Sequence, residues 1–305
     1  MNAAIERVIR QASTVILGKE KQIRLSVACL LARGHLLIED LPGVGKTTLA
    51  HVLARSLGLE FRRIQFTSDL LPADIVGVSI YERDSGAFKF HPGPIFSQLI
   101  LADEVNRATP KTQSALLEAM EEHQVTVEGE TRPLPEPFFV IATQNPSYQV
   151  GTFPLPESQL DRFLMRIQLG YPDRQAERGL LQGVARRDLL EKLTPCMDVA
   201  ELQSLQRQAT QVHAADALVD YVQAIIDYTR RSPDYLNGMS PRAGLALLAT
   251  ARTWALMDAR KAVLPEDVQA VLPAVVGHRL RLATERGVLD GADLGERIAA
   301  EVAIP

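Results

Sequence analysis

The chain has 305 residues, of which 46% are hydrophobic, and a formal net charge of −4. This length suits one large domain or two ordinary ones, and the charge argues against the broad basic surface of a nucleic-acid-binding protein. The apolar runs are too short for a membrane span, and the first residues lack the apolar core of a signal peptide. We therefore expect a soluble cytoplasmic protein without a membrane span.

Apolar segments in the first half of the chain predict five β-strands. They cover residues 34–40, 61–66, 98–104, 138–145 and 162–169. Two of them are apolar at nearly every position, which is typical of central parallel strands buried on both faces. Amphipathic helical patterns lie between the strands, and this alternation implies an α/β sheet with crossover connections.

Two further segments alternate between apolar and polar residues on either side of a turn. Residues 78–93 alternate about a turn at 84–86, and residues 123–135 alternate about a turn at 128–130. Both patterns predict β-hairpins. Because each segment lies between sheet strands, we expect both hairpins to project from the core.

The second half of the chain has helical patterns and no further strand signal. The predicted helices cover residues 175–187, 199–212, 217–232, 240–257 and 265–277. Tyr171-Pro172 marks the change. We expect an α/β domain over residues 1–170 and an all-α domain over residues 171–305.

The stretch LIEDLPGVGKTTLA, residues 37–50, joins a predicted strand to a predicted helix. Gly43 and Gly45 give a backbone that can aim N–H groups at phosphate oxygens, while Lys46 gives a charge and Thr47 a hydroxyl for Mg²⁺. A plain glycine-proline turn is the alternative. A lysine in the first turn of a helix opposes the helix dipole unless it meets an anion, which favours a nucleotide site.

Asp40 stands where the strict phosphate-loop pattern has a glycine. A carboxylate this close to bound phosphates must turn away from them or find a basic partner. We therefore predict that Asp40 points away from the pocket wrapped by Gly43 to Thr47.

Two carboxylates follow the apolar strand LILADE, residues 99–104. Asp103 would hold Mg²⁺ directly or through water, and Glu104 would act on the attacking water as a general base. An acidic strand end with solvated side chains is the plainer alternative. The second carboxylate favours hydrolysis over phosphoryl transfer to a small-molecule acceptor.

Three other polar residues are candidates for the same chemistry. Asn145 ends a predicted strand, where it would either position a water molecule or cap the strand before Pro146. Arg242 lies in the first turn of a predicted helix, where a cation is misplaced unless it reaches a negative group. Arg162 has a simpler alternative, a weak surface ion pair with a neighbour such as Asp161.

The most specific segments of the chain are EDLPGVGKTTLA, FHPGPIFSQLILADEVNRATPKTQSALLEAMEEHQVTV, FVIATQNP and GTFPLPESQLDRFL. Together they resemble the MoxR family of AAA+ ATPases, which is related to magnesium-chelatase motor subunits. The resemblance runs from about residue 15 to residue 280. It implies a P-loop three-layer sandwich with a parallel sheet, followed by an all-α lid. The two hairpins are similar to the family's helix-2 insert and pre-sensor-1 insert.

The resemblance also implies a role for each matching residue. It implies an ATP-binding loop of Pro42, Gly43, Val44, Gly45, Lys46, Thr47 and Thr48, with Ile16, Leu17 and Gly18 flanking the adenine. It implies Mg²⁺ ligation by Thr47 and Asp103, catalysis by Glu104, a sensor-1 role for Asn145 and a sensor-2 role for Arg242. It implies that Arg162 is an arginine finger acting on ATP in a neighbouring subunit.

The family likeness implies a Mg²⁺-dependent ATPase that forms a ring, usually a hexamer. Such a ring remodels or matures a client protein, often with a partner that carries a von Willebrand factor A domain. An ATP-gated scaffold with slow turnover and the motor subunit of a metal chelatase remain alternatives. A monomeric small-molecule kinase fits poorly, because it has no use for an arginine acting in trans. DNA translocation is disfavoured, because residues 78–93 mix aromatic residues with charges of both signs.

Overall fold

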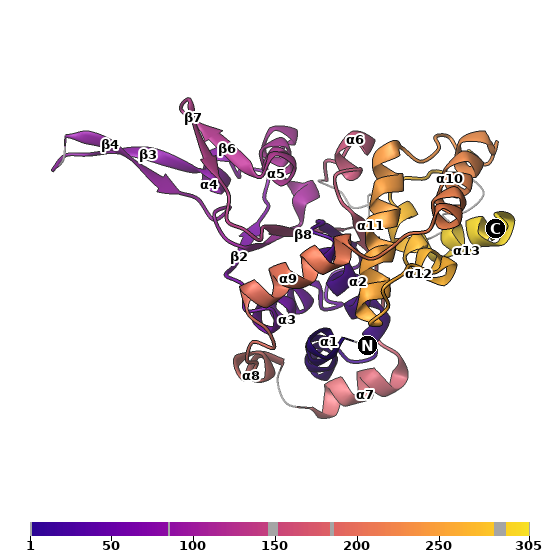
Figure 1. Ribbon diagram of the computed structural model, residues 1–305. Coiled ribbons are helices and arrows are strands. Elements are labelled where there is room, and N and C mark those ends of the chain that lie inside the picture. Colours follow the sequence, from indigo (N-terminus) through magenta and orange to yellow (C-terminus); the bar gives the residue numbers. More distant parts are fainter. Residues whose placement is uncertain (1, 85, 146–151, 184–185, 284–290, 305) are drawn as a thin grey trace.

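The computed structural model describes residues 2–84, 86–145, 152–183, 186–283 and 291–304 (Figure 1). All five predicted strands are present and form one parallel sheet in the order β2-β5-β8-β1-β9. They are β1 (Leu36–Glu39), β2 (Phe61–Gln65), β5 (Leu99–Asp103), β8 (Phe139–Gln144) and β9 (Met165–Ile167). The parallel α/β fold is thereby confirmed, and its strands end along one edge of the sheet.

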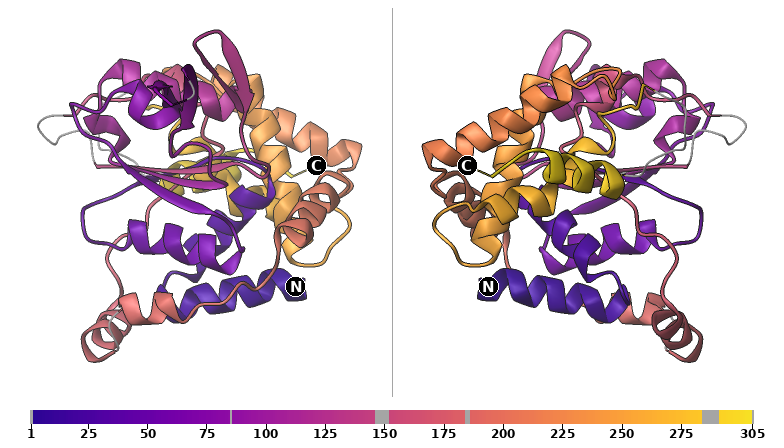
Figure 2. Two further views of the ribbon diagram at one scale, coloured as in Figure 1. Left: turned by 90° about the vertical axis from the view of Figure 1, so that its left-hand side faces the viewer. Right: turned by 90° about the vertical axis from the view of Figure 1, so that its right-hand side faces the viewer.

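Helices cover both faces of this sheet (Figure 2). Side chains alternate between the faces of a strand, so Leu36 and Ile38 join one buried cluster and Leu37 joins the other. The first face carries α1 (Ala3–Val15), α2 (Glu20–Leu31) and α3 (Lys46–Ser56), and the second carries α4 (Pro72–Val76) and α5 (Pro110–Glu122). The result is a three-layer sandwich.

After β9 the described chain forms helices joined by loops, with two isolated β-bridges and no further strand. Its helices are α7 (Arg174–Gln182), α8 (Arg186–Glu191), α9 (Val199–Thr210), α10 (Asp216–Arg231), α11 (Pro241–Met257), α12 (Pro265–Val276) and α13 (Gly291–Glu301). The single helix expected over residues 175–187 is wrong. The first helix ends at Gln182 because Gly183 takes an extended conformation, and residues 184–185 lie outside the described chain. Two glycines, which are poor helix formers, hid α13 from sequence analysis.

One apolar core joins the sheet to these later helices. Leu247 of α11 and Val271 of α12 are fully buried in the same cluster as Val27 of α2. Helix α11 packs against α2, and α12 packs against β9. The helical part therefore rests on the first face and the β9 edge of the sheet. In the described part of the chain, no helix has the length and apolar character needed to cross a membrane.

Both predicted hairpins are present as two-stranded antiparallel sheets. Strand β3 (Gly77–Glu82) pairs with β4 (Ala87–Pro92), and β6 (Gln124–Val127) pairs with β7 (Glu130–Pro133). Ser85, in the first turn, lies outside the described residues. The β3–β4 hairpin projects from the body of the molecule (Figure 1).

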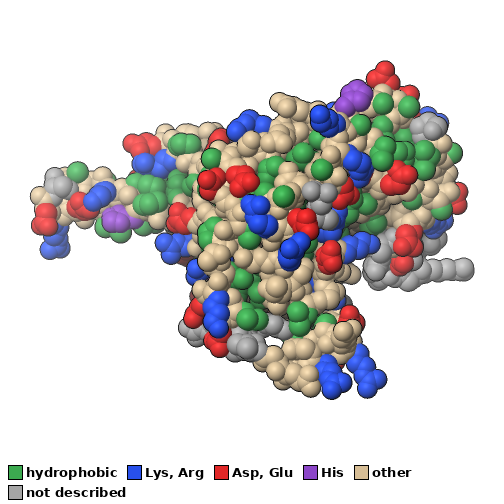
Figure 3. All heavy atoms as spheres, turned by 60° about the horizontal axis from the view of Figure 1, so that its bottom comes forward, with side chains coloured by type: hydrophobic (Ala, Val, Ile, Leu, Met, Phe, Trp, Pro, Cys, Tyr) green, Lys and Arg blue, Asp and Glu red, His purple; other side chains and the backbone are tan. Residues whose placement is uncertain are grey.

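The projecting hairpin carries charges of both signs beside hydrophobic side chains (Figure 3). Glu82 and Lys89 form an ion pair at 3.1 Å, and the ring of Tyr81 contacts that of Phe88. At the base, a Cβ atom on Gly77 would lie 2.3 Å from the carbonyl oxygen of His91. The two strands can approach this closely only because residue 77 has no side chain.

Candidate functional site

The segment between β1 and α3 has the backbone of a phosphate loop. Gly43 and Gly45 have φ angles of 85° and 100°, in the left-handed region that favours glycine. Gly45 is the N-cap of α3, so the first N–H groups of that helix have no partner within the helix. Such a helix start suits an anion.

Lys46 begins α3 and is buried. Among the described residues its ammonium group donates to neutral oxygens only: the carbonyls of Asp40 and Leu41, and the side-chain oxygen of Asn145 at 3.4 Å. Burial lowers the pKa of Lys46, and nearby carboxylates, first that of Asp40, oppose the lowering. A buried cation bonded only to neutral oxygens is suited to receive a negative ligand.

Asp40 turns its carboxylate away from the loop, as predicted. One oxygen accepts from the backbone N–H groups of Leu169 and Gly170, both at 2.6 Å, and the other accepts from the N–H of Leu41. The carboxylate therefore fastens the end of β1 to the residues after β9. It is satisfied by backbone donors, and only its carbonyl oxygen meets Lys46.

Asp103 ends β5 and is buried. One carboxylate oxygen accepts from the Thr143 hydroxyl at 2.6 Å. The other accepts from Nε and Nη2 of Arg63, on the neighbouring strand β2, at 3.0 and 2.6 Å. Sequence analysis missed Arg63. A metal ion that binds Asp103 would have to displace this guanidinium group or share the carboxylate with it.

Glu104 follows Asp103 and has a φ of 57°, a strained value for a residue other than glycine. Its carboxylate accepts from Gln65 at 3.1 Å, from Arg107 at 3.2 Å and from the side-chain nitrogen of Asn145 at 3.0 Å. The alternative of a freely solvated acid is therefore wrong. Three donors fix the direction of this carboxylate.

Asn145 connects the charged residues of this edge. Its side chain is buried, with its nitrogen on Glu104 and its oxygen facing the ammonium group of Lys46. Lys46, Asp103, Glu104 and Asn145, which we call the Lys46 cluster, thus meet where β1, β5 and β8 end. That edge is where parallel α/β sheets bind ligands.

Arg162 and Arg242 meet each other at Glu121 of α5, and no hydrogen bond or ion pair of the described chain joins either of them to the Lys46 cluster. Arg162 Nε lies 2.9 Å from one carboxylate oxygen, and Arg242 Nη2 contacts the other. The ion pair considered between Arg162 and Asp161 is wrong, because Asp161 pairs with Arg279 at 2.6 Å. We call Arg162, Arg242 and Glu121 the arginine cluster.

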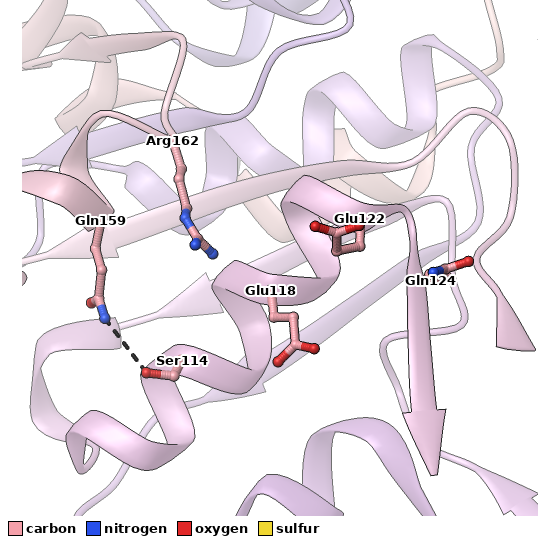
Figure 4. A pocket seen from close by; sticks show the side chains of 6 residues that line it. All are labelled: Ser114, Glu118, Glu122, Gln124, Gln159 and Arg162. Carbon is pink, nitrogen blue, oxygen red and sulfur yellow. Dashed lines mark hydrogen bonds between the residues drawn. The ribbon is translucent and has the colours of Figure 1, made fainter. Parts of the chain in front are cut away.

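Arg162 also borders an open pocket of about 460 Å³ (Figure 4). Its side chain comes from the segment after α6 (Glu157–Leu160) and reaches over α5. The other lining residues are polar: Ser114, Glu118, Glu122, Gln124 and Gln159. A ligand that reaches this guanidinium group through the pocket needs no rearrangement of the core.

A buried arginine holds the segment that carries Arg162. Arg279, just after α12, donates to the Asp161 carboxylate and to the carbonyl of Phe163 at 2.7 Å. Burial lowers the pKa of Arg279, whereas its hydrogen bond to Asp161 acts to raise it. Asp161 also accepts from Ser240, the N-cap of α11, at 3.0 Å. Residues 161–163 are thus attached to the lid helices.

The matches to known proteins agree with this geometry. The model of the ATPase family associated with various cellular activities (AAA) matches residues 35–165, and that of the AAA lid domain matches residues 227–298. The Mycobacterium tuberculosis protein named Chaperone MoxR1 is 40% identical, over 98% of this chain and 80% of its own length. The chain belongs to the MoxR family of AAA+ ATPases. Paracoccus denitrificans Protein MoxR is 32% identical, over 88% of this chain and 86% of its own.

A solved structure supports the MoxR architecture. A Cytophaga hutchinsonii protein, presented as a candidate ATPase, aligns with a TM-score of 0.89 and 36% identity, covering 99% of this chain and 95% of its own. The predicted AAA+ sandwich with a helical lid is therefore confirmed.

The remaining predicted ATP-binding residues surround the MoxR phosphate loop and the end of α1. Thr47 and Thr48 are half-buried in the first turn of α3, while Pro42 is exposed and Val44 packs against the core. Ile16, Leu17 and Gly18 follow α1 and lie against α7, where a Cβ on Gly18 would be 3.1 Å from the Cβ of Ala176. No hydrogen bond in the described chain joins residues 16–18 to the Lys46 cluster.

Proposed function

We propose that this MoxR-family chain is a Mg²⁺-dependent ATP hydrolase that works as a ring-forming, chaperone-like motor. The observation that supports this most directly is the bridge made by Asn145 between the buried Lys46 and the oriented Glu104. A phosphate-binding cation and a general base are thereby held in one network. This is the arrangement that hydrolysis of a phosphoanhydride requires.

The residues present fit a nucleoside triphosphate with Mg²⁺. Lys46 and the unpartnered N–H groups of α3 suit the phosphates, whereas the Thr47 hydroxyl and the Asp103 carboxylate are oxygen ligands of the kind Mg²⁺ prefers. When bound, Mg²⁺ neutralises charge that develops on the phosphate oxygens. We assign the adenine to the segment Ile16–Gly18, which lies beside α7.

In this mechanism Glu104 accepts the proton of the attacking water. Its left-handed backbone and its three donors hold the carboxylate in one direction before substrate arrives. Asn145 bonds to that carboxylate and to Lys46, and thereby fixes the position of one relative to the other. Such preorganisation lowers the barrier because the charged groups need not reorient during reaction.

We assign Arg162 and Arg242 to the nucleotide of a neighbouring subunit. Both reach Glu121 in their own chain, and Arg242 lies at the start of the lid helix α11. This assignment makes a single subunit catalytically incomplete and supports a homo-oligomer, which we propose to be a hexameric ring. The division into residues 1–170 and a lid of residues 171–305 belongs to the same proposal.

The biological setting rests on the family. A relative named as a chaperone supports action on a client protein, and we extend this to a von Willebrand factor A domain partner and a cytoplasmic location. The mixed charges on the β3–β4 hairpin suit a protein contact better than a nucleic acid.

One observation favours a second candidate, an ATP-gated scaffold with slow turnover. Arg63 already neutralises Asp103, and such a contact suits a resting state that is held until assembly. A motor subunit of a metal chelatase would share the same site and differ only in its client.

The decisive experiment measures ATP hydrolysis per subunit against protein concentration, with and without Mg²⁺. The motor predicts a rate that needs Mg²⁺ and rises as subunits assemble, together with loss of nucleotide binding in Lys46→Ala. A rate per subunit that stays flat across the assembly transition would reject action in trans. Negligible turnover with the correct partner present would favour the scaffold.

A further inference from the structure

We propose that Glu121 is a positioning residue that holds Arg162 and Arg242 together as one doubly cationic unit for the neighbouring subunit's triphosphate. The inference rests on the proposed action of these arginines in trans. It gives a role to a carboxylate that is not part of the Lys46 cluster and that otherwise serves as a surface ion pair.

Glu121 divides its two oxygens between the two arginines. One oxygen meets Nε of Arg162 at 2.9 Å, and the other meets Nη2 of Arg242. A guanidinium group has five N–H donors, so each arginine keeps most of its donors for another anion. The side chains are 30% and 48% exposed, and those donors are therefore accessible.

The carboxylate also solves an electrostatic problem. Two guanidinium groups that converge on one point repel each other unless an anion lies between them. Arg242 has the further disadvantage of lying in the first turn of α11, where the helix dipole disfavours a cation. With Glu121 in place the cluster carries a net single positive charge and remains attractive to a triphosphate.

The surroundings fix this unit from three sides. Met120, next to Glu121, accepts a hydrogen bond from the buried His35 at 3.1 Å. Arg162 follows Asp161, which is held by Arg279, and Arg242 follows the N-cap of α11. The open pocket beside Arg162 gives room for a ligand, and Glu118 and Glu122 line it too, so the two arginines must supply the attraction for an anion (Figure 4). A fixed pair of cations on an open face is suited to an anion from another subunit.

The test mixes two impaired variants. Glu104→Gln subunits hydrolyse ATP about 10²-fold more slowly but offer intact arginines, whereas Arg162→Ala subunits keep Glu104 but offer no arginine finger. Mixed assemblies should regain ATPase activity at interfaces where the arginines of a Glu104→Gln subunit meet the nucleotide site of an Arg162→Ala subunit. Adding Glu121→Gln to the Glu104→Gln subunit should lower the regained rate about 10-fold, the effect of a small loss of transition-state stabilisation. Adding Glu121→Gln to the Arg162→Ala subunit should change the rate less than about twofold.

Comparing Glu121→Gln in the two kinds of subunit distinguishes a positioning role from an effect on stability. Damage to folding would lower the rate in either placement, and ATP affinity of each variant by a fluorescent analogue verifies an intact site. Glu201→Gln in the Glu104→Gln subunit is the matched control, because in the described chain Glu201, in the first turn of α9, pairs with neither arginine and does not line the pocket. Equal effects in both placements, or an unchanged or faster rate, overturn the role of Glu121. An inactive parent mixture instead rejects action in trans, and the inference with it.

Discussion

The Lys46 cluster and the arginine cluster contain the same kinds of charge in opposite proportion. The first holds a buried lysine, the buried Asp103 and the half-buried Glu104 where the parallel strands end, and Asn145 joins the lysine to Glu104. The second exposes two arginines around one carboxylate, where α5, the segment after α6 and α11 meet. One cluster is thus a set of largely buried groups that already bond to one another and to Arg63, and the other is a more exposed group in which two arginines share one carboxylate. Under the proposed action in trans, a second subunit would bring the arginine cluster to the nucleotide held by the Lys46 cluster.

Arg162→Ala gives the largest expected effect on this comparison. An arginine acting in trans is worth about 10³-fold or more in rate, so the assembled variant should lose about that much ATPase activity. Nucleotide affinity of isolated subunits should not change. Steady-state hydrolysis above the assembly concentration measures the first, and fluorescence titration measures the second.

The matched control for that change is Arg231→Ala, which removes a strongly exposed arginine from the end of α10. It should keep the wild-type rate. Normal hydrolysis by assembled Arg162→Ala would show that the arginine cluster has no part in the reaction.

Glu104→Gln tests the other cluster. Glutamine keeps the shape and an acceptor oxygen for Asn145 but cannot take a proton. We expect hydrolysis to fall about 10²-fold, the usual contribution of a general base, while ATP binding is retained. Single-turnover hydrolysis and binding of a fluorescent ATP analogue give both quantities. Loss of binding together with hydrolysis would mean that Glu104 chiefly maintains the loop.

His35 joins β8 to α5 and gives a pH-dependent prediction. Its Nδ1 accepts from the N–H of Val140 in β8, so its Nε2 carries the proton and donates to Met120 beside the arginine cluster. Burial lowers the pKa of His35 to about 4. The fold therefore favours neutral His35. The free energy of unfolding is unaffected above pH ~6.5, falls as the pH drops below that value, and is about 3 kcal/mol lower near pH 4.

Urea denaturation between pH 7.5 and 4 measures this window. His35→Gln, which keeps a donor and an acceptor but does not titrate, should show a flatter dependence. His213→Gln, at an exposed histidine, should keep the wild-type slope. An identical slope in His35→Gln and wild type would remove His35 as the cause.

Arg63→Gln has the smallest expected effect and concerns only the Lys46 cluster. The Arg63–Asp103 pair is part-exposed on the arginine side, and such pairs are worth up to ~1 kcal/mol. Because Mg²⁺ must compete with this cation, the Mg²⁺ concentration needed for half-maximal binding of a fluorescent ATP analogue should fall about fivefold. Arg62→Gln, the neighbour on β2, should leave it unchanged. An unchanged or higher Mg²⁺ requirement in Arg63→Gln would show that the pair is not a competitor.

The sequence predicted the features that depend on local pattern. Apolar runs and alternation predicted all five sheet strands and both hairpins, and the constraint on a carboxylate beside phosphate predicted the direction of Asp40. Ion-pair partners were not predictable in this way. Arg63 meets Asp103 across 40 residues, and Arg242 meets Glu121 across 121. The adjacent Asp161 was the local alternative for Arg162, but successive residues point in different directions, and Arg162 pairs with Glu121 instead.

Arg279 has a mechanical consequence. Its buried side chain follows the lid helix α12. It donates to the carboxylate of Asp161 and to the carbonyl of Phe163, the residues on either side of Arg162. Ser240, at the start of α11, donates a hydrogen bond to the same carboxylate. If the lid tilts, these bonds would move Arg162 together with it. In the proposed ring, the orientation of one subunit's lid would then set the position of its Arg162 at the nucleotide of the neighbouring subunit.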